Sequence, residues 1–342
     1  MLREIREQPA RLARFCDEAG PQLRALGRRL RRKPPPVVVL AARGTSDNAA
    51  LYGRYLIETR WGVPTSLAAP SVVTLYGARL RLRGALVIAL SQSGASTDIV
   101  EFLAAARARG ALTVAITNHG GSPLARAAHE TVLLRTGPER SVAATKTYTA
   151  QLTALSLLIA EAAGAPALAA RHADLPAQAA RALRIEDQVR EVARHWRRLE
   201  GCLVTSRGYN FATAREAALK LKETCYLVAE PLSSADLIHG PIAIIERGFP
   251  VLLIAPPGNA FPHLAAIAAR LRRRRADTVV LASDPALLRR ATVPLAIPVA
   301  VDEALSPHVY VIPLQLLAYH LSRLRGLDPD RPRGLRKVTR GR

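Results

Sequence analysis

The stretch 85-ALVIALSQSGASTD-98 decides the fold of this chain. Its apolar half, Ala85–Leu90, has the composition of a buried strand, and apolar residues recur at helical spacing in Ile99–Arg109. The segment between them is therefore predicted to be a tight loop that leads into a helix N-terminus. Its hydroxyl side chains, together with the free N–H groups of a first helical turn, suit a phosphate or a sulfate. A serine-rich capping loop without a ligand is the alternative that this stretch alone leaves open.

Short apolar strands alternate with helices on both sides of this stretch. Upstream, a predicted strand at Val37–Ala42 runs into a second hydroxyl-bearing loop, Arg43–Asn48, and then into a helix. Downstream, strands are expected at Leu112–Thr117 and Thr131–Arg135, followed by a long helix to about Ala162. This alternation predicts a doubly wound parallel sheet, with ligands at the carboxyl ends of its strands.

The second half of the chain repeats the pattern. Cys202–Asn210 resembles the first strand and loop, and Val251–Asn259 resembles the strand and loop quoted above. The loop at residues 256–259 reads PPGN and has lost the hydroxyl groups, so we expect a single complete anion site. The fold class is therefore expected to be α/β, with two doubly wound, flavodoxin-like parallel-sheet domains in tandem. The expected divisions are a helical arm at 1–29, a first domain at 30–170, a second domain at 194–332 and a tail at 333–342.

The composition is that of a globular protein with an unusual charge. Of its 342 residues 49% are hydrophobic, and the formal net charge is +22. This charge suggests nucleic-acid binding, but the basic runs Arg28–Lys33 and Arg272–Arg275 close helical segments, where cations complement the helix dipole. Aromatic residues make up only 4% of the chain and do not interleave with these runs, so base stacking is not favoured. Nucleic acid is therefore not an expected partner, and the positive field is expected to attract small anions.

Targeting and metal-binding signals are weak throughout the sequence. The first residues are charged and lack the apolar core of a signal peptide, and no apolar run approaches the ~18 residues of a membrane span. We therefore expect a cytoplasmic protein without a membrane partner. Cys16, Cys202 and Cys225 are too widely spaced for a disulfide framework or a metal cluster, so we expect buried free thiols and no metal site.

Candidate acid–base chemistry lies in the second half, on one predicted helix. Glu216, Lys220 and Glu223 stand at i, i+4 and i+7, on the same helix face. Apolar neighbours indicate that this helix is mostly buried, and a buried carboxylate beside a lysine is a candidate general base. A solvated ion pair is the alternative. Lysine is scarce, because arginine supplies nearly all of the 49 basic residues, and only lysine can lose its proton or form a Schiff base.

Two further positions could carry chemistry. His239 precedes Gly240-Pro241, so it is predicted in a rigid turn rather than on a helix face. It is either a structural histidine or an acid–base group. Lys337 lies in a basic tail, in which Pro332 and Leu335 could dock the chain and so deliver the lysine to a cleft.

Seven motifs in a fixed order carry a resemblance to the sugar-isomerase (SIS) domain family. They are ARGTS at 42–46, LSQSG at 90–94, SVAATK at 141–146, EAALKLKE at 216–223, IHGP at 238–241, IPLQLLAYH at 312–320 and DRPRGLRKV at 330–338. From about residue 35 to residue 339 the chain resembles the isomerase half of glucosamine-6-phosphate synthase, which is a pair of SIS domains. The synthase's glutaminase domain has no counterpart here, and no cysteine directly follows Met1, so we expect no glutamine hydrolysis.

The resemblance implies a role for each matching residue. Glu223 would move a proton between C1 and C2 of the open-chain sugar, with Lys220 and Glu216 in support. His239 would assist ring opening from the neighbouring subunit, and Lys337 would form a Schiff base with a ketose or lie over the site. The phosphate and sugar would be bound by Thr45, Ser46, Ser91, Gln92, Ser93, Ser96, Val142 and Ala144. No metal or redox cofactor is implied, because proton transfer between adjacent carbons needs only a base and an acid.

The expected function is that of an amino-sugar-phosphate isomerase or deaminase. It would interconvert glucosamine-6-phosphate with fructose-6-phosphate and ammonia, as a homodimer whose sites are shared between subunits. Two departures from the synthase concern the choice of sugar, because Ala95 replaces a glutamate and Ala144 replaces a serine. The alternatives are a deglycase for another 6-phospho amino sugar or amine conjugate, and a non-catalytic phosphosugar-binding SIS sensor.

Overall fold

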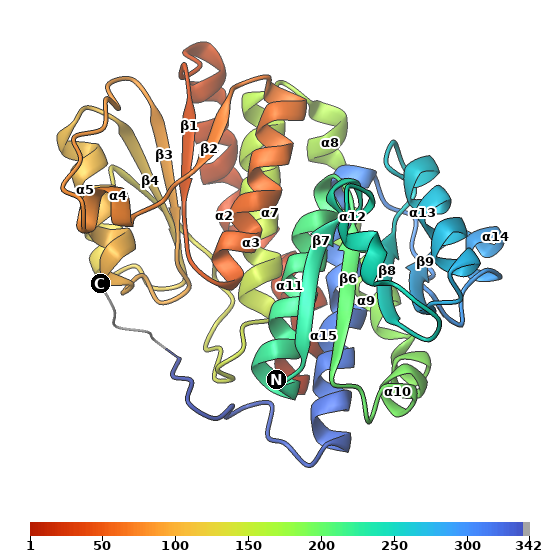
Figure 1. Cartoon of the computed structure of the whole chain (residues 1–342). Coiled ribbons are helices and arrows are strands. Elements are labelled where there is room, and N and C mark those ends of the chain that lie inside the picture. The colour runs from red at the N-terminus through yellow and green to blue at the C-terminus, as the bar shows by residue number, and fades with distance from the viewer. Residues whose placement is uncertain (338–342) are drawn as a thin grey trace. The chain divides into compact units, whose positions relative to one another are not determined.

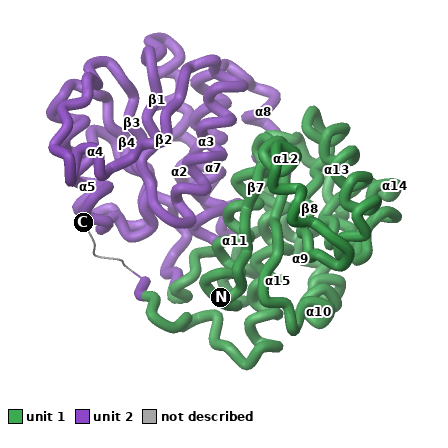
Figure 2. The backbone as a smooth tube through the Cα atoms, in the orientation of Figure 1, with its two compact units in different colours: residues 1–9, 140–145, 175–335 green, residues 10–139, 146–174, 336–342 purple. Residues whose placement is uncertain are grey.

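The computed structural model describes residues 1–337 and divides the chain into two compact units. Figure 2 shows them as tubes of different colour. Unit 2 comprises Ala10–Glu139, Lys146–Asp174 and the chain from Arg336 on, and unit 1 comprises Met1–Pro9, Arg140–Thr145 and Leu175–Leu335. Each unit contains one five-stranded parallel sheet. The predicted fold class is therefore confirmed.

The sheet of unit 2 has the strand order β2-β1-β3-β4-β5. Its strands are β1 (Val38–Ala41), β2 (Thr65–Leu67), β3 (Leu86–Leu90), β4 (Leu112–Thr117) and β5 (Glu130–Leu133). Figure 1 shows helices α3 and α7 on one side of this sheet and α4 and α5 on the other. Every residue of β1 and β3 is buried, as expected of strands that are covered on both faces.

The helices of unit 2 alternate with its strands, after α2, which begins in unit 1 and precedes β1. They are α2 (Gln8–Arg32), α3 (Thr45–Leu56) with a π turn at Ile57–Trp61, α4 (Ser71–Thr74), α5 (Thr97–Ala108), α6 (Pro123–Ala127), α7 (Lys146–Ala162), α8 (Pro166–Ala170) and a 3₁₀ turn at Arg171–Asp174. Phe102 and Leu103 of α5 pack with Val87 and Ala89 of β3 in one apolar core. Each large side chain of this kind contributes roughly 1.5–3 kcal/mol through its burial.

The sheet of unit 1 has the order β10-β9-β8-β6-β7, which is the same pattern in the second half of the chain. Its strands are β6 (Gly201–Ser206), β7 (Val228–Ser233), β8 (Pro250–Ala255), β9 (Asp277–Ala282) and β10 (Val293–Ala296). Its helical segments are α1 (Leu2–Arg6), α9 (Leu175–Leu183), α10 (Glu186–His195), α11 (Tyr209–Cys225), α12 (Ser234–Ile238), α13 (Phe261–Arg273), α14 (Pro285–Leu288) and α15 (Ser306–Leu324), with 3₁₀ turns at Pro241–Ile244 and Glu303–Leu305.

One local expectation needs correction. Cys202 and Cys225 are buried free thiols, but Cys16 is only partly buried. Burial raises the pKa of the Cys225 thiol to about 11, so this side chain behaves as a small apolar group. None of the helices within residues 1–337 combines the length and the apolar character needed to span a membrane. The tail expected at 333–342 is described only as far as Lys337, and its last five positions lie outside the described residues.

Candidate functional site

The loop at Ser91–Ser96 links β3 to α5 in unit 2, as the sequence predicts. The Ser91 hydroxyl accepts a hydrogen bond from the Gly94 N–H at 3.1 Å and lies 3.5 Å from the Ser96 hydroxyl. The Ser93 hydroxyl accepts from the Ala95 N–H at 3.2 Å. These bonds fold the loop into a compact turn that presents hydroxyl groups at the N-terminus of α5.

Glycine is required at the centre of this turn. Gly94 has φ +63°, a left-handed conformation that favours glycine. A Cβ at this position would lie 2.2 Å from the Ser122 hydroxyl and 2.5 Å from the Ser122 Cβ. The Ser122 hydroxyl in turn caps α6 by accepting from the Ala125 N–H at 3.3 Å. The loop geometry is therefore fixed by a close approach to the next loop along the sheet edge.

The second hydroxyl-bearing loop lies beside the first. Strands β1 and β3 pair in parallel, with Ala41 opposite Ala89, so the loops that follow them leave the same edge of the sheet. In a sheet of this strand order, that edge between β1 and β3 is the topological switch point where ligands bind. The Ser46 hydroxyl accepts from Gln151 Nε2 at 2.9 Å, and Thr45 begins α3.

This edge of unit 2 is suited to an anion. Within residues 1–337, no carboxylate accepts a hydrogen bond from the N–H groups of residues 92–96. The one acidic residue in the first turn of α5, Asp98, accepts from the Ile99 N–H at 2.9 Å instead. The Arg43 guanidinium contacts the Asp98 carboxylate at 2.7 Å, so the charge of this carboxylate is offset by a neighbouring cation. A phosphate could accept hydrogen bonds from the hydroxyl groups and N–H groups together.

The predicted acid–base cluster is present on α11 in unit 1. The Lys220 ammonium donates to the Glu223 carboxylate and lies 3.5 Å from the Glu216 carboxylate. The side chains of Glu216 and Lys220 are 0% and 1% exposed, whereas that of Glu223 is 24% exposed. The solvated ion pair considered from the sequence is therefore wrong for Glu216 and Lys220. Glu223 is the carboxylate of this cluster that an external molecule can reach.

Three other predicted residues of unit 1 lie in loops. His239 follows α12 in an exposed turn, and Gly240 beside it has φ +135°. No hydrogen bond or ion pair joins the His239 side chain to another of residues 1–337. Val142 and Ala144 are partly exposed in the segment before α7, where the Val142 N–H donates to the Asp330 carbonyl at 3.2 Å.

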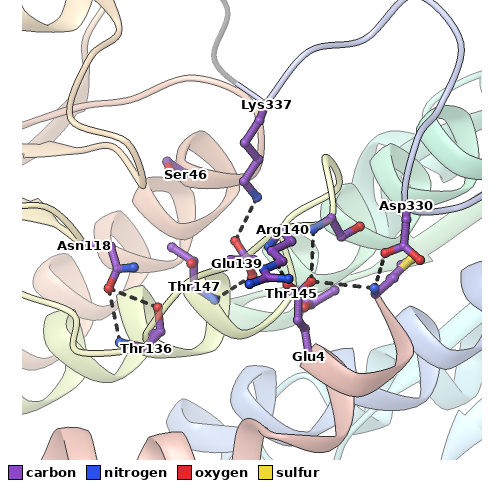
Figure 3. A network of polar contacts seen from close by, with 12 residues as sticks. Glu4, Ser46, Asn118, Thr136, Glu139, Arg140, Thr145, Thr147, Asp330 and Lys337 are labelled. Atoms are coloured by element: carbon purple, nitrogen blue, oxygen red, sulfur yellow. Dashed lines mark hydrogen bonds and ion pairs between the residues drawn. The ribbon is translucent and has the colours of Figure 1, made fainter.

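Lys337 has a buried partner that the sequence did not indicate. Its ammonium donates to Glu139 Oε2 at 3.2 Å, and Glu139 Oε1 accepts from the Thr147 N–H at 3.2 Å (Figure 3). Both residues belong to unit 2, and the Glu139 side chain is 0% exposed. The carboxylate therefore joins the C-terminal segment to the first turn of α7, whose N–H groups favour a negative charge.

Sequence reasoning missed three residues near these groups, namely Arg43, Glu139 and Gln151. Two signals were available in the sequence. Arg43 lies inside the ARGTS motif, and Glu139 stands directly before the run that leads into α7. Gln151 gave no signal, because it lies in the mostly apolar helix α7. Its amide reaches the Ser46 hydroxyl only because α3 packs on α7 in the folded protein. Charged residues are recognisable beside a motif, whereas a contact between helices depends on the tertiary fold.

Comparison with known proteins agrees with this architecture. The protein family described as "SIS domain" matches this chain twice, at residues 34–161 and 201–325. A curated relative, the glutamine–fructose-6-phosphate aminotransferase (isomerizing) of Methanothermobacter thermautotrophicus, is 39% identical over 344 aligned residues. The alignment covers 99% of this chain and 57% of the relative, so the chain spans little more than half of that protein.

Two solved structures have the same fold over nearly the whole chain. One is a protein from Silicibacter pomeroyi that is provisionally named a phosphosugar isomerase, with 38% identity, a TM-score of 0.86 and coverage of 96% of this chain and 98% of that one. The other is the C-terminal domain of glucosamine-fructose-6-phosphate aminotransferase from Francisella tularensis, with 27% identity and a TM-score of 0.88. That comparison covers 97% of this chain and 98% of the other.

Proposed function

Since the chain belongs to the SIS domain family, we propose that it interconverts glucosamine-6-phosphate with fructose-6-phosphate and free ammonia. The observation that carries this proposal is the α11 cluster. Lys220 holds two carboxylates, of which Glu216 is enclosed and Glu223 is accessible. A positioned, accessible carboxylate is what proton transfer between two adjacent carbons requires.

The phosphate of the sugar is proposed to bind at the hydroxyl loops of unit 2. Ser91, Gln92, Ser93 and Ser96 would surround it from one loop, and Thr45 and Ser46 from the other. The support is the shared sheet edge of the two loops, and the N–H groups of residues 92–96, from which no carboxylate within residues 1–337 accepts a hydrogen bond. Binding energy at the phosphate, which does not react, can hold the reacting end in position.

Glu223 is proposed to act on C1 and C2. In the deaminating direction its carboxylate takes the proton from C2 of the open-chain aldehyde and delivers it to C1. The product is an imine at C2, which water hydrolyses to fructose-6-phosphate and ammonia. Lys220 would hold the orientation of Glu223 and balance its charge, because its ammonium already contacts that carboxylate.

His239 and Lys337 are proposed to serve the steps on either side of proton transfer. Ring opening needs an acid–base group at O1 and O5, which is the role assigned to His239. The exposure of its turn is compatible with service to a neighbouring subunit in a homodimer. Lys337 would form a Schiff base at C2 of the ketose or cover the sugar, and Glu139 would hold its ammonium until then. Val142 and Ala144 would lie beside the sugar hydroxyls.

The proposal is tested by incubating the purified chain with glucosamine-6-phosphate and measuring ammonia and fructose-6-phosphate. We expect both products in equal amounts, and Glu223→Gln should release them at least about 100-fold more slowly. Equal rates for the parent and this variant would overturn the assignment of Glu223. A panel of 6-phospho amino sugars and amine conjugates should be run in parallel. A clear preference for another member of the panel would replace glucosamine-6-phosphate by that substrate.

A further inference from the structure

The loops that follow the central strands correspond between the two units. Both sheets have the same strand order, so the connection from β8 to α13 corresponds to the connection from β3 to α5. The preceding connections are also alike, because Gly44 has φ +55° and ψ −130° while Gly208 has φ +63° and ψ −137°. The same backbone framework therefore occurs at the switch point of each sheet.

Corresponding contacts reach the long helix that follows the last strand of each sheet. Two residues after Gly44, the Ser46 hydroxyl accepts from Gln151 of α7 at 2.9 Å. Two residues after Gly208, the Asn210 amide donates to the Ser306 hydroxyl of α15 at 2.6 Å. The frameworks thus agree in side-chain contacts as well as in backbone geometry, and the two helix starts can be compared for what occupies them.

The start of α13 is occupied by a carboxylate of the chain itself. Glu303 Oε2 accepts from the Asn259 N–H at 2.7 Å, and Glu303 Oε1 accepts from the Ala260 N–H at 3.1 Å. Gly258 has φ +132°, and a Cβ there would lie 2.4 Å from the Glu303 carboxyl carbon. A bidentate anion at the positive end of a 13-residue helix is the arrangement that a bound phosphate would adopt.

We infer that Glu303 is a resident anion that fills the phosphate position of the second domain. Its carboxylate replaces the phosphate at α13, so the chain binds one sugar phosphate, at α5, rather than two. The comparison with α5 rests on the proposed function, whereas the occupancy of the α13 start by Glu303 does not. This assignment also explains why the PPGN loop can dispense with hydroxyl groups.

Removal of the resident anion should leave a site that an external anion can fill. In Glu303→Ala we expect a lower Tm than in the parent, because two N–H groups and a helix dipole lose their partner. Inorganic phosphate should then raise the Tm of this variant by about 3 °C more than it raises that of the parent. Sodium chloride at matched ionic strength should produce no such difference.

Two further variants control the measurement. Asp302 lies next to Glu303, and its side chain caps the turn at Glu303–Leu305. Asp302→Asn removes this negative charge but keeps Glu303, so phosphate should raise the Tm of this variant as much as it raises that of the parent. Glu303→Gln keeps acceptor oxygen but no charge, and its response should fall between those of the parent and Glu303→Ala. Equal phosphate-induced shifts in the parent and the two Glu303 variants would overturn the inference.

Stoichiometry provides an independent arm of the test. Equilibrium dialysis of the parent against fructose-6-phosphate should saturate at one molecule per chain, and saturation at two would contradict a filled second site. If the parent binds no fructose-6-phosphate, the proposed phosphate site at α5 is wrong. That result would leave the phosphate response of Glu303→Ala unchanged, so the two failures can be told apart.

Discussion

Lys220 contacts two carboxylates but leaves them in different surroundings. Glu216 is completely enclosed and Glu223 is 24% exposed, although both lie on the same face of α11. Burial of an ion pair is costly unless the partners satisfy each other, so the enclosed pair is best understood as a fixed support. Removal of Lys220 would leave Glu216 buried without its cation, and loss of stability would then accompany any loss of turnover.

Glu139 is predicted to hold the C-terminal segment through Lys337. In Glu139→Gln the amide oxygen can still accept from the Thr147 N–H, but the charge that faces the Lys337 ammonium is lost. We expect faster trypsin cleavage after Arg336, measured by mass spectrometry of the released peptide, because the segment would leave its position more often.

The matched control for this prediction is Glu130→Gln. Glu130 pairs with Arg29 at 2.9 Å on the surface of the same unit, so this variant removes an equal charge without touching Lys337. Its cleavage rate after Arg336 should equal the parent's. Equal rates in Glu139→Gln and the parent would show that the buried carboxylate does not restrain the segment.

At the scale of elements, the Ser91–Ser96 loop is predicted to act on substrate affinity. Ser93→Ala removes a hydroxyl that could bind the phosphate, and a hydrogen bond to a charged group is worth about 1.5–3 kcal/mol. We therefore expect KM to rise at least about tenfold with little change in kcat. The control is Ser66→Ala, which removes the hydroxyl of an exposed serine on β2 and should leave KM unchanged. Steady-state kinetics of the two variants and the parent make this comparison. An unchanged KM would contradict phosphate binding at this loop.

The turn after α8 should make stability depend on pH. His172 is buried, with its ring contacting the Ser156 hydroxyl at 2.7 Å and the Leu168 carbonyl at 2.9 Å. Burial lowers the pKa of His172 from 6.5 to about 4, so between these values the unfolded chain binds the proton first. The stabilisation is complete above pH 6.5 and is lost as the pH falls toward 4, by about 3 kcal/mol in total.

Denaturant unfolding between pH 7 and pH 4.5 measures this loss. The free energy of unfolding should decrease less steeply with falling pH in His172→Gln than in the parent. His119→Gln, in which an exposed histidine is replaced, should retain the parental slope. A parental slope in His172→Gln would show that this histidine does not contribute.

The elements that were predictable from the sequence are those with an unbroken apolar pattern. β3 and α7 were expected at essentially their observed positions because burial on all sides leaves a continuous signal. β7 was missed, since Pro231 interrupts it and Glu230 is exposed; proline is tolerated there because β7 is the edge strand of its sheet. β10, the strand at the opposite edge, pairs with β9 and buries only Leu295 completely, so its apolar signal is weak.

The candidate site was predictable to the extent that its residues lie in local motifs. Spacing alone was enough to place the loop at Ser91–Ser96 and the acid–base cluster on α11, since a strand end and a helix face are local properties. Two contacts could not be found this way, namely that of Lys337 with Glu139 and that of the Asn259 N–H with Glu303. The residues of each pair are separated by 198 and 44 positions, respectively, and only the tertiary fold brings such residues together.

At the scale of the whole molecule, a homodimer with shared sites is predicted to show complementation. If His239 serves the neighbouring subunit, mixed dimers of Glu223→Gln and His239→Asn each contain one intact site. Random mixing of the two inactive variants after co-refolding should then restore about a quarter of parental activity, because half of the dimers are mixed. Separate preparations of each variant, refolded alone, are the control. No recovery in a confirmed mixed dimer would place His239 in the site of its own subunit.

Proton transfer between C2 and C1 is the central step of this account, and proton NMR in D₂O measures it directly. With glucosamine-6-phosphate as substrate, the parent should remove the C2 proton and form fructose-6-phosphate that carries the transferred proton or solvent deuterium at C1. Glu223→Gln should bind the sugar phosphate with similar affinity but react at least about 100-fold more slowly. A parent that leaves the C2 proton in place, or a variant that removes it at the parental rate, would contradict the account.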